Sequence, residues 1–331
     1  MLNRMKKGLL CLMMLLTSGV ALGQEAYSSY GVLKLPGSTR VAALGGDNIS
    51  SLDDDPGAGW SNPALLSGVS DKSFGLNFMT YNHGSQYMGG SIVKALGQRH
   101  TLAVQMQVLR YGDIDETDEG GNVTGTFCPT DFVGSVGYSY LLSDRWAGGA
   151  NLKMTSQSYD GYTSFAMSVD LGLNYYDEDI DMSLSATARN IGTQLISFRD
   201  GQAAHLPFTL QLGLSKGLAT LPLRFHVTMT DLTRWKTSYY YHAEGEEGPG
   251  FGKKLINHFI VGLDVMPTNY LYLSAGYNCR RGYELKSADK AKFAGFTFGG
   301  GLQLQKFKCG ISWARYHVGA SSLMFSVGYS I

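Results

Sequence analysis

The feature that most constrains this chain is an alternation of apolar residues with small or polar ones over unusually long stretches. Between positions 165 and 175, every second residue is apolar: Phe165, Met167, Val169, Leu171, Leu173 and Tyr175. The residues between them are small or polar and include Asp170. Because side chains alternate between the two faces of a strand, this period of two predicts a β-strand with one wholly apolar face. Similar alternation recurs at 207–216, 223–230 and 322–331.

The length of these strands distinguishes a membrane barrel from a soluble sandwich. Soluble strands average about five or six residues, whereas a tilted strand needs about ten to cross a bilayer core, as the alternation here provides. A sandwich usually places Lys and Glu on its polar faces, but here those faces carry Ser, Thr, Gln, Asn and Gly, and only 16% of residues are charged. We therefore expect an all-β fold, a transmembrane antiparallel β-barrel of the outer membrane.

The number of such segments predicts about fourteen strands, and even numbers are typical of bacterial barrels. A glycine content of 43 in 331 residues also suggests many strands and tight turns. The predicted strands are 73–80, 86–94, 100–111, 131–141, 145–159, 163–176, 181–191, 207–216, 223–233, 257–267, 269–280, 293–305, 307–316 and 322–331.

The connections between these strands alternate in length. The three longest, at 112–130, 192–206 and 234–256, all follow odd-numbered strands, and so does the connection at 281–292. Connections after even-numbered strands are uniformly short. Because bacterial barrels have short periplasmic turns and longer external loops, we expect both termini in the periplasm and the long loops outside the cell.

The start of the chain predicts a secretory signal peptide over 1–23. Basic residues in the first seven positions precede the apolar stretch 8–16, and small residues suited to cleavage follow at positions 21 and 23. The apolar stretch is shorter than the about 20 residues that a spanning helix needs. We expect the mature chain to begin near Gln24, with an uncleaved N-terminal anchor as the alternative.

The segment 24–72 precedes the first predicted strand and contains two motifs with turn chemistry. Gly45-Gly46 permits a tight turn or positive φ. In Asn62-Pro63-Ala64, the proline restricts Asn62 to extended geometry, and the asparagine side chain can bond its own backbone in a turn. Large barrels are often filled by such segments. We therefore expect 24–72 to form a plug, or hatch, within the lumen of a transmembrane β-barrel formed by 73–331.

These motifs give the chain a resemblance to a known family. The stretch LPGSTRVAALGG at 35–46, the aspartates at 53–55 and NPALL at 62–66 precede the predicted strands, and in this order they resemble the FadL-type outer-membrane family. Within that family, they are similar to a barrel of the type IX protein secretion system of Bacteroidetes. The resemblance implies that the following are plug residues: Gly45, Gly46, Asn62, Pro63 and Ala64.

The resemblance also implies a function. In the first alternative, the barrel anchors a PorZ-like surface protein of the attachment complex through its external loops, with other type IX secretion components as partners. In the second, which the wider family supplies, it is a passive channel for uptake of hydrophobic small molecules. A deep apolar pocket would favour uptake, whereas a closed, polar lumen under large ordered loops would favour anchoring.

Few other residues suggest chemistry. Asp53, Asp54 and Asp55 could offer oxygens to Ca²⁺, but the chain lacks the spacing of a complete calcium loop, so we expect solvated loop charges. Clustered tyrosines give large contact area at low entropic cost, so Tyr239, Tyr240 and Tyr241 predict a partner-binding loop.

The remaining patterns argue against several classes of function. No motif places a nucleophile beside its base, so we predict no catalytic site, no metal site, no cofactor and no enzyme. Balanced charge, with 27 basic and 27 acidic residues, lacks the basic excess of nucleic-acid partners, and outer-membrane lipid is the expected surrounding. Cys128, Cys279 and Cys309 form no disulfide framework, although Cys128 could meet Cys279.

Overall fold

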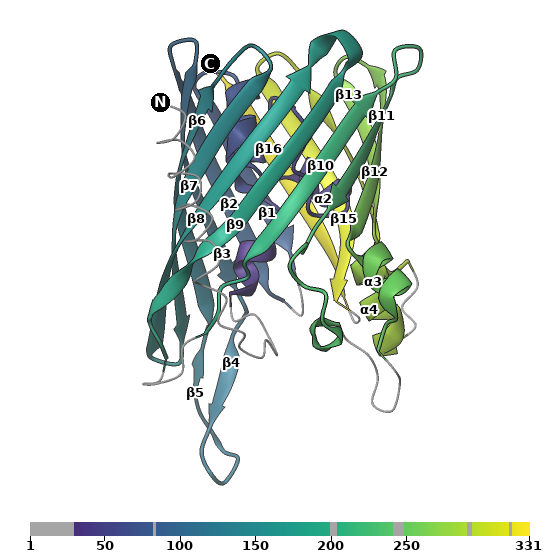
Figure 1. Cartoon of the computed structure of the whole chain (residues 1–331). Coiled ribbons are helices and arrows are strands. Elements are labelled where there is room, and N and C mark those ends of the chain that lie inside the picture. Colours follow the sequence, from purple (N-terminus) through teal and green to yellow (C-terminus); the bar gives the residue numbers. More distant parts are fainter. Residues whose placement is uncertain (1–29, 82–83, 199–203, 241–247, 290–292, 318–319) are drawn as a thin grey trace, which may run out of the picture.

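The computed structural model describes residues 30–331 except 82–83, 199–203, 241–247, 290–292 and 318–319. The predicted signal peptide at 1–23 therefore lies outside the described residues. Fourteen strands close into one antiparallel barrel (Figure 1), which confirms the predicted fold class.

The barrel strands follow one another around the wall in sequence order. They are β1 (Ser73–Thr80), β2 (Gln86–Leu96), β3 (His100–Arg110), β6 (Thr130–Leu141), β7 (Trp146–Tyr159), β8 (Tyr162–Asp177), β9 (Met182–Ile196), β10 (Thr209–Gly217), β11 (Leu223–Met229), β12 (Phe259–Thr268), β13 (Leu271–Asn278), β14 (Phe296–Gln303), β15 (Phe307–His317) and β16 (Ala320–Ser330). The wall closes where β1 pairs with β16, from Ser73 opposite Ser330 to Thr80 opposite Leu323.

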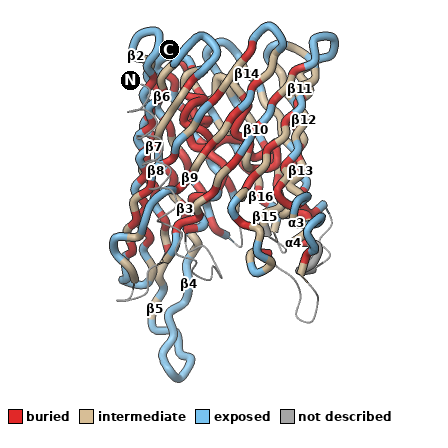
Figure 2. Tube along the Cα trace, in the orientation of Figure 1, coloured by how far each residue is buried: buried red, intermediate tan, exposed pale blue. Residues whose placement is uncertain are grey.

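The apolar faces of these strands point outward. On β8, Leu171 and Leu173 are exposed, whereas Ser168 and Asp170 are buried. On β1 buried and exposed residues alternate strictly, and Figure 2 shows the same alternation along the wall. A wall with an apolar outer face and a small or polar inner face suits a lipid surrounding.

The two ends of the barrel differ. The long connections follow β3, β9, β11 and β13 and share one end (bottom of Figure 1), which we call the long-loop end. The opposite end, which we call the short-turn end, holds short hairpin turns, one with the 3₁₀ turn η4 (Glu178–Ile180), and the C-terminus.

The long connections contain structure that the sequence analysis missed. A separate hairpin, β4 (Ile114–Thr117) and β5 (Val123–Phe127), projects from the long-loop end, and it was missed because no face of it is buried. A 3₁₀ turn η5 (Thr237–Tyr239) and helix α3 (Phe251–Asn257) separate β11 from β12. Helix α4 (Cys279–Asp289) follows β13 directly, where the predicted strand continued to 280. Among the described residues, no helix is long and apolar enough to cross a membrane.

Residues 30–72, which we call the luminal segment, lie inside the barrel (Figure 1). The segment contains η1 (Gly31–Lys34), α2 (Thr39–Ala43), η2 (Ala58–Trp60) and η3 (Pro63–Gly68). Helix α2 contacts β13 to β16, whereas η3 contacts β3, β6, β7 and β8. The segment therefore touches different sides of the wall, and most of its residues are buried (Figure 2).

Glycines on the inner faces of the strands make room for the luminal segment. A Cβ atom at Gly172 on β8 would lie 2.0 Å from Asn62 Oδ1, and one at Gly276 on β13 would lie 2.4 Å from Gly45 N. Other strand glycines lie similarly close to the segment: Gly149, Gly213, Gly262, Gly299 and Gly310. Part of the high glycine content thus reflects packing within the lumen and not only tight turns.

Candidate functional site

The two glycines singled out in the sequence end helix α2. Gly45 and Gly46 have positive φ, 96° and 92°, as the sequence predicts. Gly45 N donates to Thr297 Oγ1 on β14 at 3.0 Å, and Gly45 O accepts from Asn278 Nδ2 on β13 at 3.3 Å. A side chain at 45 would also collide with Ile260. This turn therefore ties the luminal segment to the wall.

Asn62, Pro63 and Ala64 form the start of η3 and are fully or nearly fully buried. Asn62 is extended, with φ −152° and ψ 113°, and its Oδ1 accepts from Ala64 N at 2.9 Å. Its Nδ2 donates to Ile49 O at 3.0 Å. The asparagine therefore joins two parts of the luminal segment where η3 meets the glycines of β7 and β8.

Ion pairs link the luminal segment to four strands of the wall, β9, β11, β12 and β15. Arg40 pairs with Asp264 on β12 at 2.7 Å, and Asp47 with Arg189 on β9 at 2.8 Å. The other two pairs are Asp53 with Arg224 on β11 at 3.3 Å and Asp54 with Lys308 on β15 at 2.5 Å. The segment is therefore held by charge as well as by packing.

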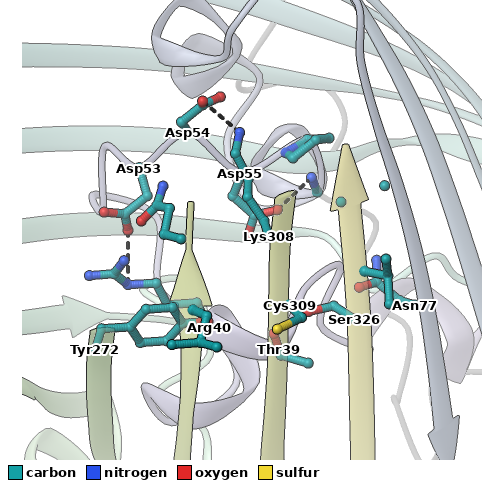
Figure 3. Close-up of a pocket in the computed structure, with 17 residues that line it drawn as sticks. Thr39, Arg40, Asp53, Asp54, Asp55, Asn77, Tyr272, Lys308, Cys309 and Ser326 are labelled. Carbon is teal, nitrogen blue, oxygen red and sulfur yellow. Dashed lines mark hydrogen bonds and ion pairs between the residues drawn. The ribbon is translucent and has the colours of Figure 1, made fainter. Parts of the chain in front are cut away.

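Arg40 is the most buried of the four charged groups that the luminal segment contributes to these pairs. Its Nε lies 3.0 Å from Asp53, and its guanidinium lies over the Tyr272 ring at 4.4 Å (Figure 3). Asp264 is fully buried and also contacts His226 Nε2 at 3.0 Å and Ser274 Oγ at 2.5 Å. Burial alone would lower the pKa of Arg40, but the carboxylates of Asp53 and Asp264 outweigh burial and raise that pKa. The guanidinium therefore stays charged.

The aspartate run is not the solvated loop charge that the sequence predicts. Asp53 contacts Arg40 and Arg224, Asp54 contacts Lys308, and Asp55 Oδ1 accepts from Gly57 N at 2.8 Å. All three carboxylates are partly buried and have hydrogen-bond or ion-pair partners, which corrects the expectation of solvated loop charges. No group of three or more potential metal ligands occurs among the described residues.

The predicted partner-binding tyrosines do not form one exposed surface. Tyr240 is buried, with its hydroxyl bonded to Arg234 O at 3.3 Å and its ring under the Arg280 guanidinium at 5.0 Å. This corrects the expectation for Tyr240, because a packed ring offers no contact area. Tyr239 is partly exposed at the end of η5, and Tyr241 lies outside the described residues.

The cysteines of the described chain are free thiols. Cys128 and Cys279 are partly buried and Cys309 is exposed. The pairing of Cys128 with Cys279 that the sequence left open is therefore not formed.

An apolar pocket at the long-loop end was not found from the sequence. It has a volume of about 430 Å³ and lies between the base of the β4–β5 hairpin, the β7–β8 turn and the chain after β9. Its lining residues are Tyr111, Ile114, Phe127, Pro129, Tyr159, Asp160, Tyr162 and Phe198. We call it the aromatic pocket. Six of these residues come from connections between barrel strands, whose placement no periodicity in the sequence reveals.

A buried carboxylate orients two of the pocket's rings. Asp131 on β6 is fully buried, and it accepts from Tyr111 and Tyr159 hydroxyls, each at 2.9 Å. The two rings lie 5.9 Å apart, and Phe198 meets the Tyr159 ring edge-on at 5.2 Å. Because the hydroxyls are engaged by Asp131, the rings present apolar surface to the pocket.

Comparison with known proteins finds solved structures with a similar fold but no related sequence. No protein-family model and no curated protein matches the sequence. Among solved structures, the Pseudomonas putida toluene transporter TodX is 16% identical, with a TM-score of 0.54 over 90% of this chain and 97% of that chain. The monoaromatic hydrocarbon channel CymD is 11% identical, with a TM-score of 0.55 over 91% of this chain and 98% of its own.

The chain has the fold of the FadL-like outer-membrane barrels. The FadL-type resemblance predicted from the sequence is therefore confirmed at the level of fold. These comparisons give no support to a specific identity within type IX secretion.

Proposed function

We propose that this protein is an outer-membrane channel for passive uptake of small apolar molecules. In this proposal the long loops face the cell exterior, both termini lie in the periplasm and the luminal segment acts as the plug. The observation that carries the proposal is the aromatic pocket of about 430 Å³ at the long-loop end. The fold shared with TodX and CymD, described as a toluene transporter and a monoaromatic hydrocarbon channel, supports it.

The chemistry of the pocket suits an aromatic ligand. Pockets of about 300–1,000 Å³ with apolar walls are typical of small-molecule sites. Aromatic rings prefer edge-to-face or offset contacts with other rings, and Tyr159 with Phe198 already shows the edge-to-face arrangement. Transfer of a small aromatic hydrocarbon from water into this pocket is favourable, because its apolar surface leaves water and it has no polar group that needs a hydrogen-bond partner.

Passage beyond the pocket meets the luminal segment. That segment is held by the ion pairs of Arg40, Asp47, Asp53 and Asp54 with the wall. A straight route through the lumen therefore requires some of these contacts to open. The pocket would capture the molecule, and release of the segment would set how readily it moves on.

Binding of toluene to the purified protein in mild detergent tests the proposal. Ile114 lines the aromatic pocket, so Ile114→Trp fills it and should weaken binding by about tenfold or more. Val123 lies on the same hairpin, is 62% exposed and does not line the pocket, so Val123→Trp is the matched control. Equal binding by the two variants would contradict the proposed site.

Anchoring of a surface protein is the second candidate function. It corresponds to a PorQ-like component of type IX secretion that holds a PorZ-like partner. The observations that favour it are the ion pairs within the lumen and the β4–β5 hairpin, which projects beyond the wall and offers exposed residues on both strands.

Pull-down of the tagged protein from detergent-solubilised membranes tests this second candidate. Recovery of a surface protein that is lost when 114–127 is replaced by a short Gly-Ser turn would favour anchoring. Recovery of the barrel without such a partner would remove the support for it. The pull-down and the toluene-binding measurement use the same detergent-solubilised protein, so their results can be compared directly.

A further inference from the structure

A second cavity, of about 150 Å³, lies between the luminal segment and the wall near the start of α4. We call it the cationic cavity. Four cationic side chains line it, namely Lys34, Arg189, Arg280 and Arg281. Two carboxylates, Asp47 and Asp231, also line it, so its lining carries an excess of two positive charges.

Two of the arginines have buried N–H groups without partners. Arg189 is 6% exposed; its Nη1 pairs with Asp47 at 2.8 Å and its Nη2 donates to Leu33 O at 3.4 Å. Its Nε is buried and has no hydrogen-bond partner among the described residues, and the same is true of Arg281 Nη1. Burying an unpartnered charged donor is costly.

Arg280 does not share this property. It pairs with Asp231 at 2.6 Å and with Glu284 at 2.9 Å, and it donates to Tyr239 O at 2.5 Å. Arg281, in contrast, forms no ion pair with the described residues; its guanidinium lies 4.3 Å from the Tyr316 ring. Arg189 and Arg280 are thus balanced by Asp47 and Asp231, whereas no described carboxylate pairs with Arg281.

The backbone adds to the positive field. Asn278, Arg280 and Arg281 line the cavity at the start of α4, an 11-residue helix. The N-terminal end of a helix carries partial positive charge and favours anions. Gly46 allows the Arg281 guanidinium to lie close to the luminal segment, because a Cβ atom there would lie 2.8 Å from Arg281 Nη2.

We propose that the cationic cavity binds a compact oxyanion, a phosphate or a carboxylate, held between Arg189, Arg281 and the start of α4. Guanidinium groups form strong charge-assisted hydrogen bonds with both kinds of oxyanion. The bound anion would join the luminal segment to α4 at the long-loop end. This site does not depend on the aromatic pocket or on the passage of apolar molecules.

Isothermal titration calorimetry of the full-length protein in detergent tests the site with two probes. Inorganic phosphate represents a free anion, and octanoate represents a carboxylate carried by an apolar chain. At least one should bind, and Arg281→Gln should weaken that binding by about tenfold or more, because a charge-assisted contact is lost. Arg99, exposed at the short-turn end and absent from the cavity, provides the control Arg99→Gln, which should bind as the wild type does.

The outcomes separate clearly. Binding of phosphate identifies a site for free anions, and binding of octanoate alone identifies the head group of an amphiphile. Absence of binding by both probes at millimolar concentration would overturn the proposal, as would equal binding by Arg281→Gln. Slower migration after heating in gels shows that each variant is a folded barrel. Should Arg281→Gln not fold, Lys34→Gln takes its place, with the same expected weakening.

Discussion

At the scale of single residues, Asp131 determines whether the lining of the aromatic pocket is polar or apolar. It accepts hydrogen bonds from the hydroxyls of Tyr111 and Tyr159, and it is itself fully buried. A pocket built from tyrosines can be apolar only if such an acceptor takes the hydroxyls. Asp131 is therefore a positioning residue for the two tyrosine rings, although it does not itself line the pocket.

Replacement of Asp131 should weaken toluene binding. In Asp131→Ala both hydroxyls lose their acceptor, and each unsatisfied group costs about 1–3 kcal/mol unless the ring turns toward water in the pocket. An unsatisfied hydroxyl, or a hydroxyl turned into the pocket, would each disfavour an apolar ligand. We expect the affinity for toluene to fall by roughly five- to tenfold. Asp144, exposed at the short-turn end and absent from the pocket lining, gives the control Asp144→Ala. Unchanged affinity in Asp131→Ala would contradict the role of Asp131.

Asp231 controls a pH-dependent contact at the long-loop end. Burial tends to raise the pKa of its carboxyl, but Arg280 and Arg234 outweigh burial and hold that pKa below its ordinary value. A depressed pKa means that the carboxylate stabilises the fold above its unfolded-state pKa, and that this stabilisation is lost as pH falls through the lower folded-state pKa. Asp231 has φ 55°, a conformation that asparagine also tolerates.

Asp231→Asn should therefore destabilise the protein at neutral pH and have little effect in acid. We expect a loss of about 1–3 kcal/mol at pH 7, from the ion pair with Arg280. The measurement is the thermal midpoint of wild type and variant across pH 7 to pH 2. A difference that stays constant over this range would rule out the ionised carboxylate as its cause.

At the scale of elements, the wall strands could be predicted from the sequence and the loop elements could not. The strand at 165–175 could be found because the inside–outside alternation is imposed by lipid on one face and the filled lumen on the other. β4 and β5 lack that signal because both faces meet solvent. Helix α4 contains one local signal, the i,i+4 pair of Arg280 with Glu284, but the contact of Arg280 with Asp231, 49 positions away, cannot be read from local periodicity.

In the luminal segment, too, features set by neighbouring residues could be predicted from the sequence, and contacts between residues far apart in the sequence could not. Its turns at Gly45-Gly46 and Asn62-Pro63 follow from residue chemistry. Its ion pairs do not, because Arg40 and Asp264 are 224 positions apart in sequence. The glycines at 172 and 276 were a usable signal, since repeated glycine on an inward face indicates that something approaches the wall.

Arg40 should hold the luminal segment in place. Arg40→Met keeps side-chain bulk but leaves Asp53 and Asp264 without their shared cation, and removing one partner of a buried pair costs about 3–5 kcal/mol. We expect larger and more frequent openings in single-channel recordings from planar bilayers. Arg145→Met is the control, because Arg145 is half exposed at the short-turn end and pairs with Asp177 and Asp179. Identical recordings for the two variants would contradict the role of Arg40.

At the scale of the whole molecule, the barrel combines an apolar exterior with a lumen that is filled and ion-paired. An apolar pocket lies at the long-loop end, and the polar contacts of the luminal segment lie within the wall. In the proposed channel, this arrangement would separate capture of an apolar molecule from the control of its passage. It predicts that filling the pocket and releasing the segment have opposite effects on uptake.

The most direct measurement is the initial rate of radiolabelled toluene uptake by bacterial cells that lack other barrels of this kind. Cells expressing the protein should take up toluene several-fold faster than cells with an empty vector. Ile114→Trp should bring the rate close to that of the empty vector, and Val123→Trp should leave it unchanged. Wild-type uptake no faster than the empty vector, at equal amounts of folded protein in the outer membrane, would contradict the proposed channel.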